Sequence, residues 1–278
     1  MPDSLLDCRE ARAGDLQRAE TCIDLSAPKS EAYATWQEAE ARANLYRFLS
    51  TAYLQPPQGD LVRQILDEDF LSSLCTLFSD RALATLRSLP AMADPEKDLP
   101  SLRQEYMDLF AVPTGRYVTP FEDVYRGKTP DGTPERGPLM GERAIAVRRL
   151  YRAAGAEMDS ECKELPTHIG VELAFMGFLC EQQAAALRAG LQAAAVESET
   201  SASANWLGYR RLQIIFLQRH LNDWFPRLSE VIQTYATTPL YRGLALLTED
   251  FLAWDAACFA AESPADRDAA PQASDGLQ

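Results

Sequence analysis

Histidine is scarce in this chain, and the motifs of the common enzyme classes are missing. Two histidines, His168 and His220, occur among 278 residues. The sequence has no glycine-rich dinucleotide loop, no phosphate-binding P-loop, no HExxH pair and no serine-hydrolase elbow. A histidine-based triad would have to use one of these two residues, and no serine stands in a recognisable nucleophile context. We therefore expect no catalytic residue, no metal ion and no cofactor held by this protein.

Long apolar runs and paired cysteines are missing as well. No stretch of 18 apolar residues occurs, so no transmembrane helix is expected. The N-terminus lacks the basic and apolar regions of a secretory signal peptide. The cysteines form no CxxC pair, and their wide scatter is typical of reduced cytosolic thiols. We therefore expect a cytoplasmic protein. The cysteines are Cys8, Cys22, Cys75, Cys162, Cys180 and Cys258.

Positive charge is in deficit. The chain has 27 Lys and Arg residues against 41 Asp and Glu residues, which gives a net charge of −14 at pH 7. Such a surface repels nucleic-acid phosphate and anionic membranes, so neither is expected as a partner. The same charge favours a basic partner. A solvated acidic surface without a particular partner produces the same balance, and both interpretations stay open.

Alternation with a period of two, the mark of a strand, is not found, whereas apolar residues recur at helical spacing along most of the chain. We predict an all-α protein of roughly eight to ten helices. His220 and Trp224 lie near a predicted helix end and are expected to be core residues. The predicted helices cover about 31–54, 61–78, 81–89, 99–112, 139–154 (with Gly155 as its end), 166–191, 206–224, 226–237 and 239–261.

Residues 113–138 interrupt the helical pattern with five Pro and four Gly. Long loops in compact domains often carry function, so this loop is a candidate region. It divides an all-helical domain at 31–262, which is either one large bundle-like domain or two helical halves joined at the loop. Residues 1–30 are expected to be a flexible extension, and residues 263–278 a disordered tail.

The first candidate segment lies in this loop, at residues 117–125. Its aromatic residues are Tyr117, Phe121 and Tyr125, and Pro120 restricts the backbone. The neighbouring acids Glu122 and Asp123 supply two carboxylates among these rings. Carboxylates beside aromatic faces suit the capture of guanidinium groups, because arginine pairs with the former and stacks on the latter. The alternative is a packed turn with a capping carboxylate and core aromatics.

The second candidate segment, residues 164–172, holds Glu164, Pro166, His168 and Glu172. These polar groups form a rim beside the loop in the functional interpretation. In the structural interpretation, His168 is an ordinary half-exposed histidine beside a carboxylate. Cys162 precedes His168 by six residues, so His168, Glu172 and Cys162 also permit a metal- or nucleotide-dependent helical enzyme. A helical scaffold or adaptor protein whose loop is only structural is a third possibility.

Together the two segments resemble the TorD/DmsD/NarJ family of chaperones for molybdenum-containing redox enzymes. The family's loop motif, Y-x-x-P-x-E-S/D-x-Y, is similar to Tyr117…Pro120-Phe-Glu-Asp-Val-Tyr125. Its second motif, E-x-P-D-H-x-x-x-E, is similar to Glu164-Leu-Pro-Thr-His-Ile-Gly-Val-Glu172, followed by Phe175-Met176. The resemblance covers roughly residues 35–260. Thr167 stands where the family has Asp, one of the residues implicated in leader binding.

The resemblance implies a function without catalysis. Members of this family bind the twin-arginine leader or the apo-subunit of a molybdopterin oxidoreductase, delay its export and assist cofactor insertion. It implies peptide contact by Tyr117, Pro120, Glu122, Asp123, Tyr125, Glu164, Pro166, His168 and Glu172. We expect an open notch with carboxylates for the arginines, rings for stacking and His168 as an orienting group. The family also implies a monomer or a dimer that exchanges halves at 113–138.

Overall fold

The computed structural model describes residues 5–6, 36–75, 78–89, 95–113, 115–128, 134–194 and 205–260. The predicted N-terminal extension, apart from residues 5–6, and the predicted tail lie outside this part. Within it, helices dominate and the predicted all-α class is confirmed. Two pairs of two-residue strands accompany them. The parallel pair is β1 (Leu5–Leu6) with β4 (Glu157–Met158), and the antiparallel pair is β2 (Gly127–Lys128) with β3 (Pro134–Glu135).

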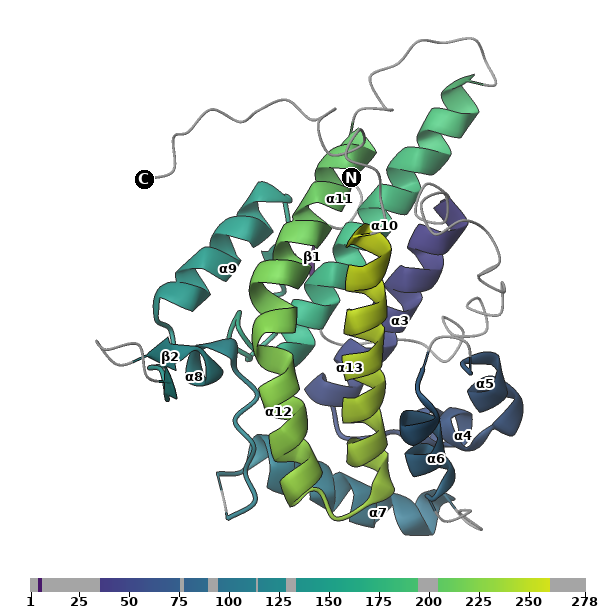
Figure 1. Ribbon diagram of the computed structural model, residues 1–278, viewed down its shortest axis with the longest axis vertical. Coiled ribbons are helices and arrows are strands. Elements are labelled where there is room, and N and C mark those ends of the chain that lie inside the picture. Colours follow the sequence, from purple (N-terminus) through teal and green to yellow (C-terminus); the bar gives the residue numbers. More distant parts are fainter. Residues whose placement is uncertain are drawn as a thin grey trace.

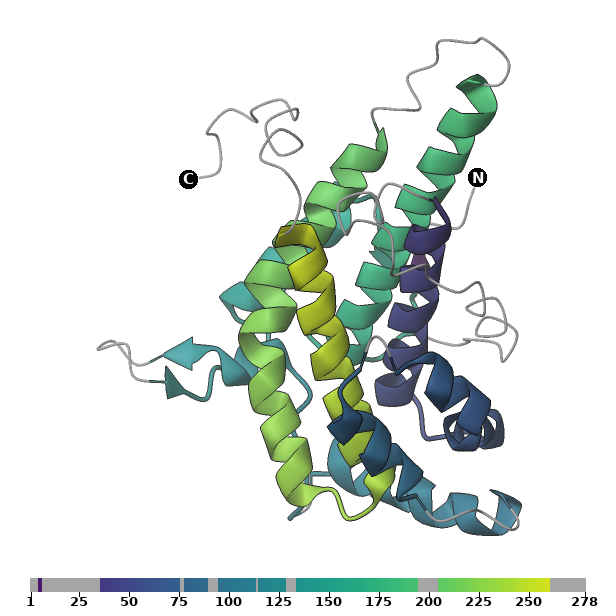
Figure 2. The same cartoon turned by 45° about the vertical axis from the view of Figure 1, so that its right-hand side comes forward.

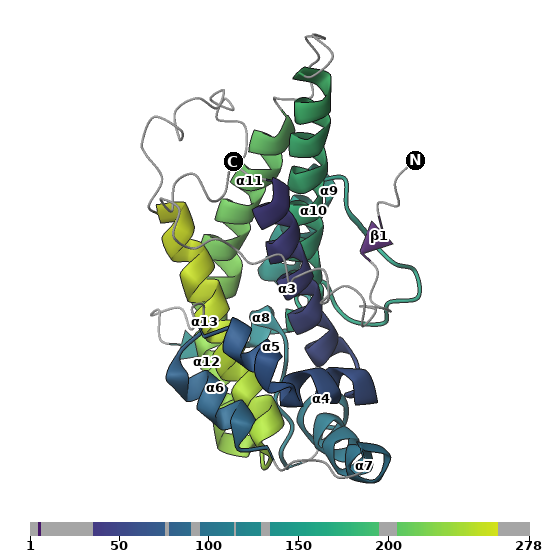
Figure 3. The ribbon, with the colours of Figure 1, turned by 90° about the vertical axis from the view of Figure 1, so that its right-hand side faces the viewer.

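Long helices run along the molecule, and most of the shorter ones gather around its lower half, whereas the helix at Glu142–Ala153 lies at one side of the long helices (Figures 1 and 3). The long helices are α3 (Trp36–Leu54), α10 (Ile169–Ala194), α11 (Asn205–Phe216), α12 (Asn222–Tyr235) and α13 (Pro239–Ala260). The others are α4 (Gly59–Leu66), α5 (Glu68–Ser73), α6 (Asp80–Arg87), α7 (Pro95–Tyr106), α8 (Glu122–Tyr125) and α9 (Glu142–Ala153). Two π-helical turns, η1 (Met107–Ala111) and η3 (Leu217–Leu221), continue α7 and α11. No helix in this part of the chain is long and apolar enough to span a bilayer.

The close packing of α3 on α10 depends on a small residue. Gly170 lies in the first turn of α10, and a Cβ there would overlap the side chain of Leu54. Ser50 Oγ donates a hydrogen bond of 2.7 Å to the Gly170 carbonyl oxygen. The buried apolar residues on either side of the 113–138 loop belong to one hydrophobic cluster. The two sequence halves therefore share a core, which holds the start of α10 in a fixed place.

A buried ion pair joins α3 to α13. Arg42 donates to both carboxylate oxygens of Asp255, at 2.8 and 2.9 Å, and Tyr46 donates its hydroxyl to the same carboxylate. Arg42 and Asp255 are 1% and 0% exposed. Breaking such a pair leaves an uncompensated charge in the core, so the contact specifies one arrangement of the two helices.

Some predicted boundaries are wrong for local reasons. The helix predicted at 61–78 is divided, because Asp67 caps α5 by accepting from the amides of Asp69 and Phe70. The helices predicted on either side of residue 225 are continuous, with Pro226 inside α12. The π-helical turn before α12 shifts the hydrogen-bond register, which accommodates the proline. The end of α9 is as predicted, with Gly155 at φ 71°.

Candidate functional site

Backbone hydrogen bonds join the two candidate segments. The amide of Glu122 donates to the carbonyl of Thr167 at 2.9 Å, and the amide of Ile169 donates to the carbonyl of Pro120 at 2.9 Å. Phe121 and His168 form an isolated antiparallel bridge between these bonds. The loop and the start of α10 therefore come together as the sequence suggested, and they hold each other by main-chain contacts. We name Glu122, Arg126, Glu172, His220 and Trp224 the Glu122 cluster.

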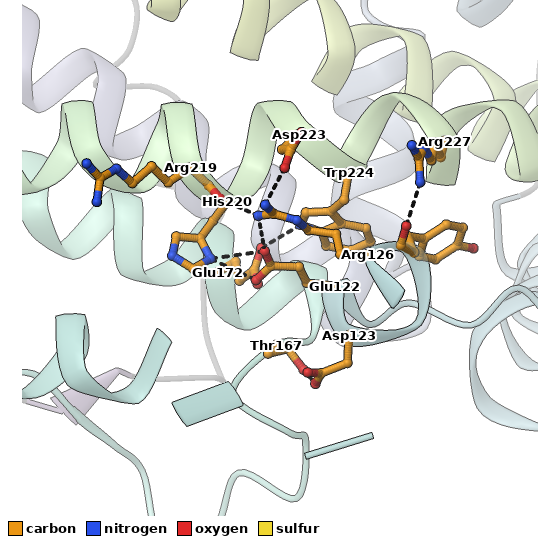
Figure 4. A network of polar contacts seen from close by, with 11 residues as sticks. Glu122, Asp123, Arg126, Thr167, Glu172, Arg219, His220, Asp223, Trp224 and Arg227 are labelled. Carbon is orange, nitrogen blue, oxygen red and sulfur yellow. Dashed lines mark hydrogen bonds and ion pairs between the residues drawn. The ribbon is translucent and has the colours of Figure 1, made fainter. Parts of the chain in front are cut away.

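Glu122 is the centre of this cluster (Figure 4). Its carboxylate receives Arg126 Nη1 at 2.7 Å and His220 Nδ1 at 2.8 Å, and the side chain is fully buried. Burial alone would raise the pKa of Glu122. The hydrogen bond and charge of His220, followed by those of Arg126, outweigh burial and lower the pKa. Glu122 is therefore an ionised carboxylate that already holds a guanidinium.

Glu172 carries the second buried carboxyl group of the cluster. It lies in the first turn of α10, is 0% exposed and accepts a hydrogen bond of 3.0 Å from Trp224 Nε1. Burial, then the charge of Glu122, raises the pKa of Glu172 well above its ordinary value. The two carboxyl groups therefore differ in charge, with Glu122 ionised and Glu172 favouring the protonated form. This difference allows two acids to share a buried site.

Thr167, the departure from the family motif, is paired with Asp123. Thr167 donates its hydroxyl to the Asp123 carboxylate at 2.8 Å, and both side chains are buried. An aspartate at 167 would place a second carboxylate against Asp123. The threonine instead supplies the donor that Asp123 needs, so the pair is satisfied without a charge partner.

His168 acts as the cap of α10. Its Nδ1 accepts a hydrogen bond of 3.0 Å from the amide of Gly170, one of the donors left free at a helix start. Its Nε2 lies 3.9 Å from Glu164 Oε2, and Phe121 packs edge-on against the ring at 5.3 Å. Burial lowers the pKa of His168 to about 3, so the ring is neutral near pH 7.

The predicted open notch is therefore wrong for part of its lining. Glu122, Asp123, His168 and Glu172 are 0 to 3% exposed, and His220 and Trp224 lie against the carboxyl groups of Glu122 and Glu172. Pro120 and Pro166 are also buried, and the Pro166 carbonyl accepts from the Tyr151 hydroxyl at 2.8 Å. The partly exposed members of the predicted set are Tyr117, Tyr125 and Glu164. Their role in peptide contact stays a prediction.

Three cluster residues escaped sequence reasoning. His220 and Trp224 were expected to be core residues, and they are buried, but each also binds a carboxyl group of the cluster. Arg126 was not considered, although its i, i+4 spacing from Glu122 was a visible signal. Arg126 also contacts the carbonyl of Arg219 and the carboxylate of Asp223. Its side chain is 14% exposed, so it closes the cluster toward solvent.

The alternative metal site has no counterpart in the described part of the chain, where no three His, Cys, Asp or Glu side chains are placed to hold an ion. Glu172 is directed to Trp224, whereas His168 caps its own helix. The hydrogen bonds that Glu122, Asp123 and His168 make therefore have two structural roles. They fasten the loop to α10 and they hold one arginine on a buried carboxylate.

Comparison with known proteins shows the family of this chain. Residues 76–230 match the family model described as nitrate reductase delta subunit, and this span includes every residue of the Glu122 cluster. The chain is 30% identical over 149 residues to the chlorate reductase assembly chaperone protein of Ideonella dechloratans. It is 28% identical over 151 residues to the selenate reductase assembly chaperone protein of Thauera selenatis. It is 22% identical over 229 residues to the chaperone protein TorD of Vibrio cholerae serotype O1.

The coverage of these relatives differs. The alignments with the chlorate and selenate reductase chaperones cover 53% and 52% of this chain, and 65% and 66% of the relatives, just under two thirds of their length. The alignment with the Vibrio protein covers 79% of this chain and 92% of the relative. The similarity therefore extends over most of the helical part of the chain.

Proposed function

We propose, from the premise that this chain belongs to the nitrate reductase delta subunit family, that it is an assembly chaperone for a molybdopterin-containing oxidoreductase. The observation that carries the proposal is the family match over residues 76–230, which contains the whole Glu122 cluster. Relatives named as assembly chaperones of chlorate and selenate reductases support it. The chaperone binds the apo form and the N-terminal twin-arginine leader of its client, and it delays export until the cofactor is inserted. It acts by binding, without catalysis.

Leader capture takes the form of an arginine exchange. The Glu122 carboxylate is buried, so an unpaired state of this charge is costly. A leader arginine that takes the place of Arg126 preserves the ion pair and its geometry. Arg126 is the member of the cluster that can leave, because it is partly exposed and Asp223, 52% exposed, holds its other nitrogen near the surface. Exchange therefore needs no opening of the core.

Movement of Arg126 is also compatible with its neighbours in the chain. Gly127 follows directly, and the β2–β3 pair that it begins projects from the helical body (Figure 2). Tyr125 stacks on Trp224 at 5.5 Å and remains partly exposed. With Tyr117 and Glu164, Tyr125 forms the part of the site that a leader reaches first. The buried residues Pro120, Asp123, Pro166, His168 and Glu172 keep these groups in place.

Two further features follow from this function. The chaperone works in the cytoplasm, since the leader has to be bound before export. It works as a monomer or as a dimer that exchanges halves at residues 113–138. Sedimentation of the purified protein distinguishes these two states.

Affinity capture tests the proposal. The tagged chain is expressed in its native host, and bound proteins are identified by mass spectrometry. We expect enrichment of the catalytic subunit of a molybdopterin oxidoreductase that retains its leader and lacks its cofactor. A Glu122→Gln variant serves as the matched control and should capture less of it. If the folded wild-type chain enriches no such subunit, the chaperone assignment is wrong.

The arginine exchange has its own test, with a synthetic leader peptide of the captured subunit. Arg126→Gln removes the internal competitor and should tighten peptide binding severalfold, whereas Glu122→Gln should weaken it about tenfold or more. A peptide with both arginines changed to lysine should bind weakly to both forms.

Unchanged or weaker binding by a folded Arg126→Gln variant contradicts the exchange. Reversal of Glu122 and Asp123 to lysine is unsuitable, because buried lysines would unfold the protein.

A further inference from the structure

Positive charge gathers on the outer face of α9, although the protein is strongly acidic. Ile145, Arg148, Arg149 and Arg152 are exposed, and their spacing of i, i+3, i+4 and i+7 places them on one side of the helix. The chain as a whole carries −14. Within the described residues, these three arginines make no hydrogen bond or ion pair through their side chains. We name this set, with Leu139 and Met140 at its start, the α9 face.

The α9 face also exposes apolar surface. Leu139, Met140 and Ile145 are 49%, 48% and 54% exposed, within seven residues of one another. Met140 has a φ of 61°, the left-handed region that a residue with a side chain adopts at a cost. Exposed apolar side chains beside unpaired charges are typical of a protein-binding surface.

The opposite side of α9 is anchored. Ala144, Val147 and Tyr151 are buried, and the Tyr151 ring lies 4.4 Å from that of Phe175 on α10. The helix therefore cannot roll to bury its apolar residues or to insert them in a bilayer. The rigid outer face is presented to solvent in one orientation, which favours a partner with a defined shape over a lipid surface.

The α9 face lies beside the Glu122 cluster. Helix α8, which carries Glu122, packs against α9, as Figure 1 shows. Gly141 precedes α9, and a Cβ on it would lie 3.6 Å from Asp123 Oδ1. The α9 face is therefore a neighbour of the Glu122 cluster and of its partly exposed rim, Tyr117, Tyr125 and Glu164.

We propose that the α9 face binds an acidic and partly apolar surface on the folded body of the same client whose leader enters the Glu122 site. The inference rests on the proposed function. Charge complementarity selects this occupant, because the basic leader is repelled by Arg148, Arg149 and Arg152 and is attracted to the neighbouring carboxylates. One client that presents a basic leader and an acidic body would contact both surfaces at once, and each contact would strengthen the other.

The test uses the reductase subunit captured above, prepared without cofactor and with its leader deleted, and the synthetic leader peptide as a separate probe. The variant Arg148→Glu/Arg149→Glu/Arg152→Glu should bind the leaderless subunit about tenfold more weakly, or worse, at low salt. The difference should shrink at high salt. Leader-peptide affinity should not fall below that of the wild type, since the Glu122 cluster is unchanged and the arginines that repel the basic leader are gone. The corresponding Arg→Gln variant replaces the triple reversal if the latter fails to fold.

Matched controls separate a local effect from net charge. Arg63→Glu/Arg81→Glu/Arg87→Glu changes three exposed arginines on α4 and α6 and shifts the net charge by the same amount. This variant should bind the leaderless subunit like the wild type. Ile145→Asp should weaken binding, whereas Val112→Asp, at a residue 41% exposed elsewhere, should not.

Each other outcome overturns the inference in a recognisable way. Equal loss in the two triple variants, or loss in neither, means that the α9 face is not the docking surface, and leader binding still stands. Binding of phosphatidylglycerol vesicles that depends on Arg148, Arg149 and Arg152, with subunit binding unaffected, assigns the face to lipid. Failure of the wild-type chain to capture any reductase removes the proposed function and this inference together.

Discussion

Replacing His168 by asparagine should remove a pH dependence from the stability of this protein. Burial lowers the pKa of His168 from about 6.5 to about 3. Below pH 6.5, His168 therefore binds a proton in the unfolded chain but not in the folded chain. The contribution of neutral His168 to the free energy of unfolding is fully present above pH 6.5. It is lost as the pH falls below 6.5, by about 1.4 kcal/mol per pH unit. At about pH 4.5 the loss is roughly 3 kcal/mol, a large part of a typical folding free energy.

Asparagine keeps the helix cap while it abolishes the titration. Its side-chain oxygen can accept from the Gly170 amide, as His168 Nδ1 does now. Loss of the ring contact with Phe121 should cost about 1 kcal/mol at every pH. The variant should therefore be less stable than the wild type at about pH 8 and more stable at about pH 4.5, by roughly 2 kcal/mol.

Urea unfolding followed by circular dichroism, at several pH values between these limits, measures the difference. Other acids titrate in both proteins alike, so the difference isolates His168. His168→Ala serves as a control that also loses the cap, which should add a constant cost of about 1 kcal/mol. A gap between wild type and His168→Asn that stays constant with pH would refute the reasoning. In that case the Glu164 carboxylate, 3.9 Å away, stabilises the charged ring against burial.

Two further changes test the site and its loop. The pKa of Glu172 is raised in the folded state, so the wild type loses stability as the pH rises above about 4.5, by about 1.4 kcal/mol per unit until the folded pKa is passed. Glu172→Gln should not show this loss, so urea unfolding at rising pH should show the free energy of unfolding of the variant increasing relative to that of the wild type. A Cβ at Gly137 would overlap the Asp123 carbonyl oxygen, so Gly137→Ala should lower the free energy of unfolding by about 2 kcal/mol. Gly190→Ala, on an open part of α10, should raise it by about 0.5–1 kcal/mol. Equal effects of the two alanine substitutions would contradict this account of the loop.

The sequence singled out two segments that meet in the structure, but it misjudged their exposure. Aromatic, acidic and proline residues at 117–125 and 164–172 interrupt the helical pattern, and these are the segments that pair through Glu122 and Thr167. Local pattern carries this information because a break in helical spacing is visible residue by residue. Exposure is different, since it depends on which distant helix covers a residue. His220 lies 98 residues from Glu122 in sequence and nevertheless contacts its carboxylate.

Helix boundaries also divide into those that local sequence predicts and those that it does not. Gly155 ended α9 where its freedom at positive φ predicted, because that preference is local. Pro226 did not end a helix as predicted, because the π-helical turn before it changed the hydrogen-bond register. The capping role of Asp67 is local in origin and was visible in principle, since aspartate is a favoured cap.

By itself, the sequence determined the all-helical class, the family and the two segments that meet at the site, because helical period and motif spacing are properties of neighbours along the chain. The tertiary structure alone decided the state of those residues. It brings Arg126 and His220 into contact with the Glu122 carboxylate and Trp224 into contact with Glu172. It also buries residues that were expected to line an open notch. The physical reason is that charge, protonation and access depend on what packing brings within a few ångströms, and packing joins residues far apart in the chain.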